Sequence, residues 1–221
     1  MTTAEDANDA NDAKTPRERY RAQVRAEVKQ HAWEQIAADG ASALSLNAIA
    51  KRMGMSGPAL YRYFAGRDEL ITELIRDAYR SLADTFREAA EAAETAETAE
   101  TARAAEPAEV ADVGADLATL AHALRAWALD DPHRYFLIYG TPIPGYHAPA
   151  DTATIASEIL ATLLGACGDM PEGQALHRAL TFWTRLHGAL SLELAGHFTG
   201  MDFDPARFYA AEADSLAPKN S

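Results

Sequence analysis

The spacing of apolar side chains predicts a long first helix, from about residue 16 to residue 38. Apolar positions recur every four residues among Arg, Lys and Glu, at Val24, Val28, Ala32 and Ile36. A proline suits the first turn of this helix, and Gly40 follows where a helix can end. Residues 1–13 are acidic, small and without periodicity, so we expect them to form a disordered leader.

Two short helices are predicted within residues 44–70, LSLNAIAKRMGMSGPALYRYFAGRDEL. Ser45 or Asn47 can cap the first, and Gly54 follows it directly, where a left-handed conformation costs a glycine little. Ser56 can cap the second. Two short helices joined by about three residues have the spacing of a DNA-binding helix-turn-helix, in which the second helix enters the major groove.

The remainder of the chain is also predicted to be helical, with two interruptions. Helices are expected from Asp68 to about Ala93 and at about 110–129, 132–139, 152–166, 171–197 and 205–217. Residues 88–109 repeat Ala-Glu-Thr and are either a solvated continuation of the helix or a linker, which is favoured near their end. Residues 140–149 hold three prolines and two glycines, which favours a loop. Alternation of period two persists nowhere, so the predicted fold class is all-α.

These elements group into two expected domains. A helix-turn-helix DNA-binding domain would occupy 14–67, a larger helical regulatory and dimerisation domain 68–217, and a short tail 218–221. The 221 residues, 48% of them apolar, can bury a sizeable core. No apolar run approaches the roughly 18 residues of a membrane-spanning helix. Cys167 is the only cysteine and no signal peptide is recognisable, so we expect a soluble, cytoplasmic protein.

Charge is distributed unevenly along the chain, and this changes how the net charge of −13 is interpreted. Between Lys14 and Arg67 there are ten Lys or Arg against four Asp or Glu, a formal +6, whereas residues 68–221 carry a formal −15. A basic module on an acidic body is expected when only one end of a protein approaches phosphate. A solvated basic first helix would account for the same charge equally well.

Residues 44–70, with the helix before them, resemble the DNA-binding domain of the tetracycline-repressor (TetR) family. The matching features are Ile49-Ala50, Gly54 with Ser56, Leu60-Tyr61-Arg62-Tyr63-Phe64, and Arg67-Asp68-Glu69-Leu70. The stretch from Trp183 to His187 and Gly188, with FDPARFYAAEADSL after it, is similar to a C-terminal domain that carries a Trp-His-Gly signature in one branch of that family. The resemblance implies a transcriptional regulator, in most members a repressor, that binds a near-palindromic operator as a dimer and is released by a small-molecule ligand.

The resemblance also implies which side chains meet double-stranded DNA. The second short helix, at about 57–63, would read the major groove, and the contact positions are Ser45, Asn47, Ser56, Gly57, Pro58, Ala59, Tyr61, Arg62, Tyr63 and Arg67. In the family, the positions of Tyr61 and Arg67 contact phosphate. Gly57 and Ala59 carry no hydrogen-bonding side chain, so direct base reading falls mainly to Arg62, which can pair with guanine through two hydrogen bonds. Specificity would then also depend on DNA shape or on the arginine-rich start of the first helix.

The helices at about 152–166 and 171–197 would form the homodimer interface, again by resemblance. A ligand pocket would be lined by aromatic residues and a few polar groups. The candidates are Phe86, Trp127, Tyr135, Tyr139, Phe182, Trp183 and His187. Aromatic residues at helical spacing are more often core residues, so the sequence leaves open, for each of the seven, whether it contacts a ligand.

Two other classes of function are weighed against a DNA-binding regulator. An enzyme is disfavoured because the sequence holds no HExxH, no cysteine-rich metal spacing, no GxSxG and no glycine-rich phosphate loop. We therefore expect no catalytic residue, metal or cofactor. A helical adaptor that binds a partner protein would leave the basic segment 14–67 unexplained. Both remain alternatives at this point.

Overall fold

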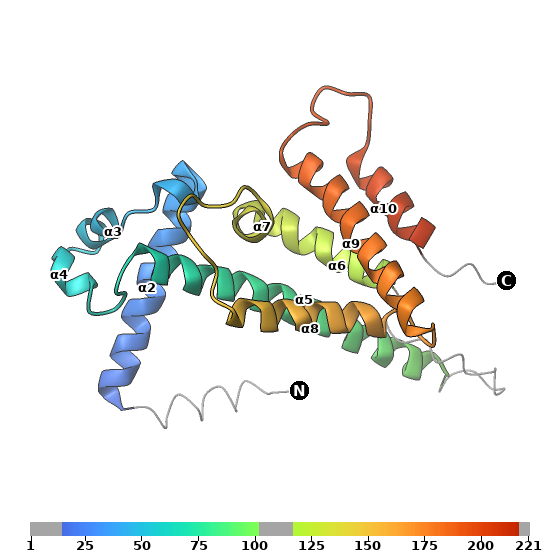
Figure 1. The fold of residues 1–221 in the computed structure, drawn as a ribbon, viewed down its shortest axis with the longest axis horizontal. Helices are drawn as coiled ribbons and strands as arrows, with labels where there is room; N and C mark the ends of the chain where they lie inside the picture. Colours follow the sequence, from blue (N-terminus) through green and yellow to red (C-terminus); the bar gives the residue numbers. More distant parts are fainter. Residues whose placement is uncertain (1–14, 102–116, 217–221) are drawn as a thin grey trace. The chain divides into compact units, whose positions relative to one another are not determined.

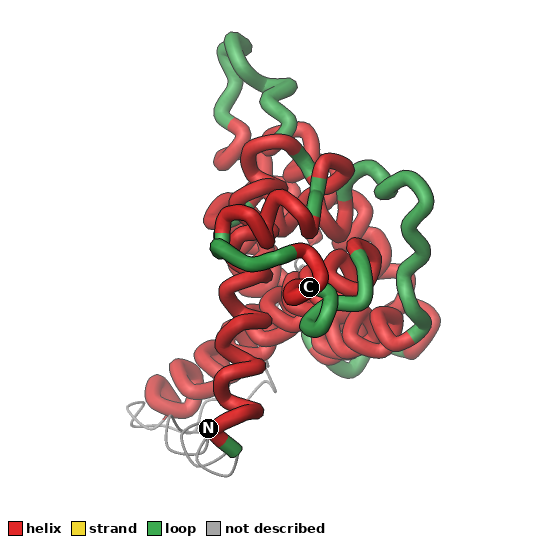
Figure 2. The backbone as a smooth tube through the Cα atoms, turned by 90° about the vertical axis from the view of Figure 1, so that its left-hand side faces the viewer, coloured by secondary structure: helices red, strands yellow, loops and turns green. Residues whose placement is uncertain are grey.

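The computed structural model describes residues 15–101 and 117–216, and within these residues it contains helices and loops but no strand (Figures 1 and 2). The predicted all-α fold is confirmed. The elements are α2 (Pro16–Asp39), the 3-10 turn η1 (Ala41–Ala43), α3 (Leu46–Arg52), α4 (Gly57–Leu60), α5 (Arg67–Thr101), α6 (Leu117–Asp130), α7 (Pro132–Tyr139), α8 (Asp151–Gly165), α9 (Glu172–Leu194) and α10 (Pro205–Leu216).

The chain divides into two compact units. Among the described residues, the first unit comprises 15–74 together with the loop segment 142–147, and the second comprises the remainder. Helix α5 contributes its first two turns to the first unit and its longer part to the second. The expected boundary at residue 67 coincides with the start of α5, whereas the compact unit extends to Leu74.

The first unit is built around the apolar stripe of α2. The four residues predicted at four-residue spacing, Val24, Val28, Ala32 and Ile36, are all buried. Thr15 caps α2 through a capping box with Glu18, in which each side chain bonds to the backbone N–H of the other residue. Leu60, Phe64 and Leu70 complete the core from the segments that follow.

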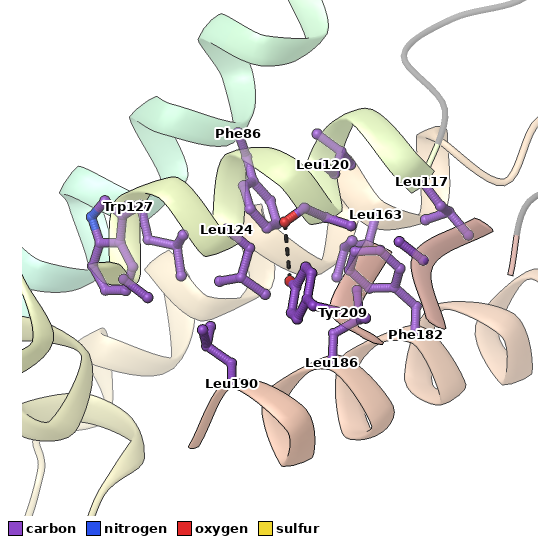
Figure 3. Close-up of a cluster of buried hydrophobic side chains, with 14 of the residues drawn as sticks. Phe86, Leu117, Leu120, Leu124, Trp127, Leu163, Phe182, Leu186, Leu190 and Tyr209 are labelled. Carbon is purple, nitrogen blue, oxygen red and sulfur yellow. Dashed lines mark hydrogen bonds between the residues drawn. The ribbon is translucent and has the colours of Figure 1, made fainter. Parts of the chain in front are cut away.

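The second unit buries a larger cluster, in which residues of α5, α6, α8, α9 and α10 meet (Figure 3). Phe86, Leu124, Phe182 and Leu186 are fully buried within it. The buried hydroxyl of Tyr209 donates to the carbonyl of Ala121 at 3.0 Å, which satisfies its only polar group. Helices α6, α9 and α10 pack on one another in this unit.

Two helices differ in length from the prediction. Helix α4 ends at Leu60 rather than near residue 63, because the chain tightens into a turn in which the N–H of Tyr63 donates to the carbonyl of Leu60 at 2.8 Å. Helix α5 continues to Thr101 because Ala and Glu favour helix. The Ala-Glu-Thr segment is thus helical in its first part. Residues 1–14, 102–116 and 217–221, which include the expected leader, the end of that segment and the tail, lie outside the described residues.

Candidate nucleic-acid interface and ligand cavity

The turn between α3 and α4 is formed by residues that suit their backbone positions. The side-chain oxygen of Ser45 accepts a hydrogen bond from the N–H of Ala48 at 3.4 Å and so caps α3. Gly54 has φ +65°, a conformation that residues with a side chain rarely adopt. The N–H of Met55 then donates to the carbonyl of Ala50 at 2.9 Å. These bonds orient α4 on α3.

The segment that follows α4 is fixed from α2, mainly by Arg25. Its guanidinium lies 4.1 Å from the ring centroid of Phe64, donates to the carbonyl of Tyr63, and pairs with Glu69 at 3.3 Å and Glu73 at 3.5 Å. Phe64 itself is fully buried. The backbone from residue 61 to residue 64 is therefore held in place, and its side chains are directed by that backbone.

The candidate DNA contacts differ in exposure. The side chains of Asn47, Ser56, Pro58, Tyr61 and Arg62 are exposed, whereas Ser45, Gly57, Ala59, Tyr63 and Arg67 are partly buried. Tyr61 is 48% exposed, a large value for an aromatic residue beside a packed core. Only the backbone of Arg62 is held, because its carbonyl accepts from the Nη2 of Arg21 at 3.3 Å.

Arg67 has its guanidinium turned toward the protein. Its Nε donates to the carbonyl of Leu44 at 3.2 Å, and its Nη2 donates to the carbonyls of Ala41 and Ser42 at 3.0 and 3.1 Å. These carbonyls belong to η1 and to the residue after it. Arg67 thus ties the start of α5 to the loop between α2 and α3.

Gly57 lies where the first turn of α4 approaches α3. A Cβ atom at this position would come within 3.2 Å of the side-chain oxygen of Asn47. A side chain at Gly57 would therefore require the exposed Asn47 side chain to shift by a few tenths of an ångström. This contact does not require a role for Gly57 in reading bases.

A cavity of about 240 Å³ lies in the second unit. Three aromatic residues line it, Tyr79 from α5, Tyr139 from the end of α7 and Trp183 from α9. The other lining residues are aliphatic and come from α8 and α9, namely Ala156, Ile159, Leu160, Leu163 and Leu180. The cavity is therefore apolar, with hydroxyl and indole groups as its polar atoms.

Behind this aromatic wall, His187 is packed among three rings. Its ring centroid lies 4.2 Å from that of Trp183, 4.3 Å from that of Tyr139 and 5.5 Å from that of Tyr135. Its Nδ1 lies 3.0 Å from the Tyr135 hydroxyl. Burial lowers the pKa of His187 to about 4, so the imidazole is neutral at physiological pH.

The seven candidate ligand residues separate into three groups by location. Tyr139 and Trp183 line the cavity, while Tyr135 and His187 pack behind them. The other three, Phe86, Trp127 and Phe182, lie in the hydrophobic core. Tyr79 was not among the predicted ligand residues. It lies seven residues before Phe86 on the same apolar face of α5, so the helical spacing could have identified it.

Within the described ranges, no group of three or more His, Cys, Asp or Glu side chains could hold a metal ion. Among the same residues, no helix combines the length and apolarity that a membrane crossing requires.

Comparison with known proteins accounts for both halves of the chain. Residues 30–74 match the model of the bacterial regulatory proteins of the tetR family, and residues 117–216 match the tetracyclin repressor-like C-terminal domain. The HTH-type transcriptional regulator Rv1816 of Mycobacterium tuberculosis is 32% identical over 230 residues, which cover 89% of this chain and 92% of the relative. The chain belongs to the TetR family. It is a DNA-binding helix-turn-helix transcriptional regulator of a non-enzymatic family.

Solved structures of similar proteins agree with this assignment of the TetR-family fold. A protein described as regulatory, SCO4313, is 60% identical to this chain with a TM-score of 0.78, and the match covers 91% of this chain and 98% of that one. A TetR variant from Acinetobacter baumannii AYE, in complex with minocycline, is 18% identical with a TM-score of 0.52, covering 86% and 91%. The second similarity concerns the fold alone.

Proposed function

We propose that this TetR-family regulator binds a near-palindromic operator as a homodimer, represses transcription from it, and is released by a small-molecule effector. The proposal rests on the contrast in solvent exposure among residues 60–64. Tyr61 and Arg62 are exposed, whereas Leu60 and Phe64 on either side of them are fully buried. A rigid backbone that presents polar side chains outward is what a major-groove reader requires.

The exposed groups divide by the chemistry that they offer to DNA. The Arg62 guanidinium can donate two hydrogen bonds to guanine, and the Pro58 and Ala59 side chains can contact a thymine methyl group. The Tyr61 hydroxyl and the Asn47 amide can donate to phosphate oxygens. Because Arg67 already donates three hydrogen bonds to carbonyls, we assign it the role of positioning α5.

Binding of the purified protein to its own upstream intergenic DNA, at several salt concentrations, tests this interface. Arg62→Ala should weaken binding, because a bidentate pair with guanine contributes about 1–3 kcal/mol per half-site. In a dimer with two half-sites, this corresponds to a loss of about thirtyfold or more. Tyr61→Phe removes only the hydroxyl and should weaken binding by the loss of a neutral hydrogen bond to phosphate, about 0.5–1.5 kcal/mol per half-site. The slope of log affinity against log salt should stay unchanged, because a neutral hydroxyl releases no counterion.

Arg87→Ala is the matched control, because it removes an exposed arginine of the second unit. It should leave the affinity for DNA unchanged. Equal affinities for the wild type, Arg62→Ala and Tyr61→Phe would overturn the assignment of the reading segment. Binding of the wild-type protein to random DNA as tightly as to every upstream fragment would contradict operator recognition at this locus.

The homodimer is proposed from the exposed apolar side chains of the second unit. Most of them lie on α9 and on the chain that follows it, at Leu176, Leu180, Leu192, Met201, Phe203 and Phe208, and one, Leu129, lies on α6. Solvent-exposed apolar residues gathered on neighbouring elements are typical of an interface. The exposed side chains after α9 favour α9 with α10, although Leu180 also lies beside α8, where it lines the cavity with Ala156 and Leu160. The resemblance implied the helices at about 152–166 and 171–197. Helix α9 is common to both arrangements.

Sedimentation velocity distinguishes the two arrangements. Leu176→Glu on α9 should convert a dimer to monomers, because it buries two unpaired carboxylates across the two-fold axis. Ala153→Glu on α8, where the side chain is exposed, should leave the dimer intact if α9 and α10 form the interface. Dissociation by Ala153→Glu would instead support the helix at about 152–166. A monomeric wild-type protein would overturn the dimer.

The effector site is proposed at the cavity of the second unit. We expect the ligand to contact Tyr139 and Trp183, with Tyr135 and His187 supporting these two rings from behind. The minocycline complex of the A. baumannii relative supports a small-molecule effector for this fold. We also propose that the chain belongs to the branch of the family with the Trp-His-Gly signature. It carries Trp183, His187 and Gly188, and the rings of the first two are in contact.

A further inference from the structure

The lining of the cavity, as far as the structure describes it, contains no charged side chain. The polar side-chain groups of the lining residues are the hydroxyls of Tyr79 and Tyr139 and the indole N–H of Trp183. These groups can exchange hydrogen bonds with a ligand, but they cannot neutralise an ion. An ionised ligand would therefore lose its hydration in this cavity without gaining a partner of opposite charge.

Two titratable groups at the cavity show that its surroundings disfavour charge of either sign. Burial raises the pKa of Tyr139 far above its ordinary value of 10.0, which disfavours the anionic phenolate. Burial lowers the pKa of His187 from 6.5 to about 4, which disfavours the cationic imidazolium. The common cause is desolvation, and it acts equally on a carboxylate or an ammonium group of a ligand.

His187 also has a buried polar atom that lacks a partner. Among the described residues, its Nε2 has no hydrogen-bond partner, whereas its Nδ1 faces the hydroxyl of Tyr135. Buried polar atoms of this kind are rare in proteins because they are costly. The ring of His187 packs against Trp183 and Tyr139, which both line the cavity. A polar group of a ligand can supply the partner only where the Tyr139 and Trp183 rings, which are themselves in contact with centroids 5.6 Å apart, move apart.

From these observations we propose that the effector is an uncharged, mostly apolar molecule that carries one hydroxyl or carbonyl group. The apolar part packs against Ile159, Leu163 and Trp183. The polar group faces Tyr139 and reaches His187 where the Tyr139 and Trp183 rings move apart. The cavity of about 240 Å³ is smaller than the 300–1,000 Å³ typical of pockets for drug-sized ligands, so the effector is small. The inference rests on the proposed function, in which this cavity holds the effector.

Three probes that share one scaffold test the charge. At pH 7, 2-phenylethanol is neutral, phenylacetate is an anion and 2-phenylethylammonium is a cation. Their binding to the full chain is measured by isothermal titration calorimetry in the absence of DNA. We expect 2-phenylethanol to bind at least about tenfold more tightly than either ion, because each ion would leave an unpaired charge in the cavity.

Two pairs of measurements locate the binding. Ala156→Phe fills the cavity and should abolish binding of 2-phenylethanol, whereas Ala153→Phe, exposed on the same helix, should not affect it. His187→Phe keeps an aromatic ring and removes both nitrogens. It should weaken the binding of 2-phenylethanol by about three- to tenfold. The affinity for ethylbenzene, which lacks the hydroxyl, should stay unchanged.

The proposal is overturned if either ion binds as tightly as 2-phenylethanol, if no probe binds, or if Ala156→Phe has no effect. Equal losses for both probes in His187→Phe would overturn the polar contact. None of these measurements involves DNA. A failure of operator binding would therefore contradict the proposed function while leaving the chemical class of the ligand intact.

Discussion

Arg25 offers the strongest test of how the proposed DNA-reading segment is held. It extends from α2 and its side chain is 25% exposed. It contacts the ring of Phe64 and the carbonyl of Tyr63, and it pairs with Glu69 and Glu73. Arg25 therefore links α2 to both the turn after α4 and the start of α5. Its removal should therefore loosen the segment that carries Tyr61 and Arg62.

The cost of Arg25→Ala follows from these contacts. The cation–π contact contributes about 0.5–2 kcal/mol and the charged hydrogen bond to the Tyr63 carbonyl about 1.5–3 kcal/mol. The two half-exposed ion pairs add little, about 0.2–1 kcal/mol each. Because contacts of one group are not additive, we expect a total loss of about 2–4 kcal/mol. For a chain of this length, this lowers the midpoint of thermal unfolding by about 5–15 °C.

Thermal unfolding followed by circular dichroism measures this effect, with Arg17→Ala as the matched control. Arg17 is an exposed arginine of the same helix, and its removal should change stability by less than about 0.5 kcal/mol. Arg25→Lys keeps the charge but not the planar stacking, so its midpoint should lie between those of the wild type and Arg25→Ala. Equal midpoints for Arg25→Ala and Arg17→Ala would refute the reasoning.

Three further predictions concern single residues. As pH falls from 6.5 to about 4, the unfolded chain protonates His187 before the folded protein does, so stability present above pH 6.5 is lost. In urea unfolding, the free energy of unfolding of the wild type should fall by about 3 kcal/mol more than that of His187→Phe across this range. Parallel profiles would contradict this prediction. Gly54→Ala should cost about 1–2 kcal/mol because of its left-handed φ, with Gly54→Asn milder; a neutral Gly54→Ala would be inconsistent with that conformation. Tyr146→Phe removes the 3.0 Å hydrogen bond to the buried hydroxyl of Thr72 and should increase hydrogen exchange of the 142–147 loop; unchanged exchange would show that this bond does not hold the loop.

The helices could be predicted because their signals are local. Four-residue spacing on α2, Gly54 after α3 and Pro132 at the start of α7 are each properties of a few neighbouring residues, and the structure has helices at these places. Element ends were less predictable. Helix α4 ends at Leu60, where the chain turns and Phe64 becomes buried in the core, and this burial depends on tertiary packing.

The role of individual side chains was harder to predict than the elements. Arg62 and Arg67 are both arginines of the same basic segment, yet the first is exposed and the second is bonded to three carbonyls. No pattern in the sequence separates them, because the carbonyls that Arg67 reaches lie more than twenty residues earlier. Gly57 similarly lies close to Asn47 on the preceding helix, a contact that only the folded chain brings about.

The sequence by itself determined the all-α class, the helix-turn-helix and the family to which the chain belongs. These depend on periodicity, on turn residues and on an ordered motif, which are all legible along the chain. The cavity was decided only by the tertiary structure, since it is formed by four helices that meet from distant parts of the sequence. Trp127 and Trp183 are alike as residues, but the first closes the core and the second lines the cavity, because burial is set by what packs against a side chain.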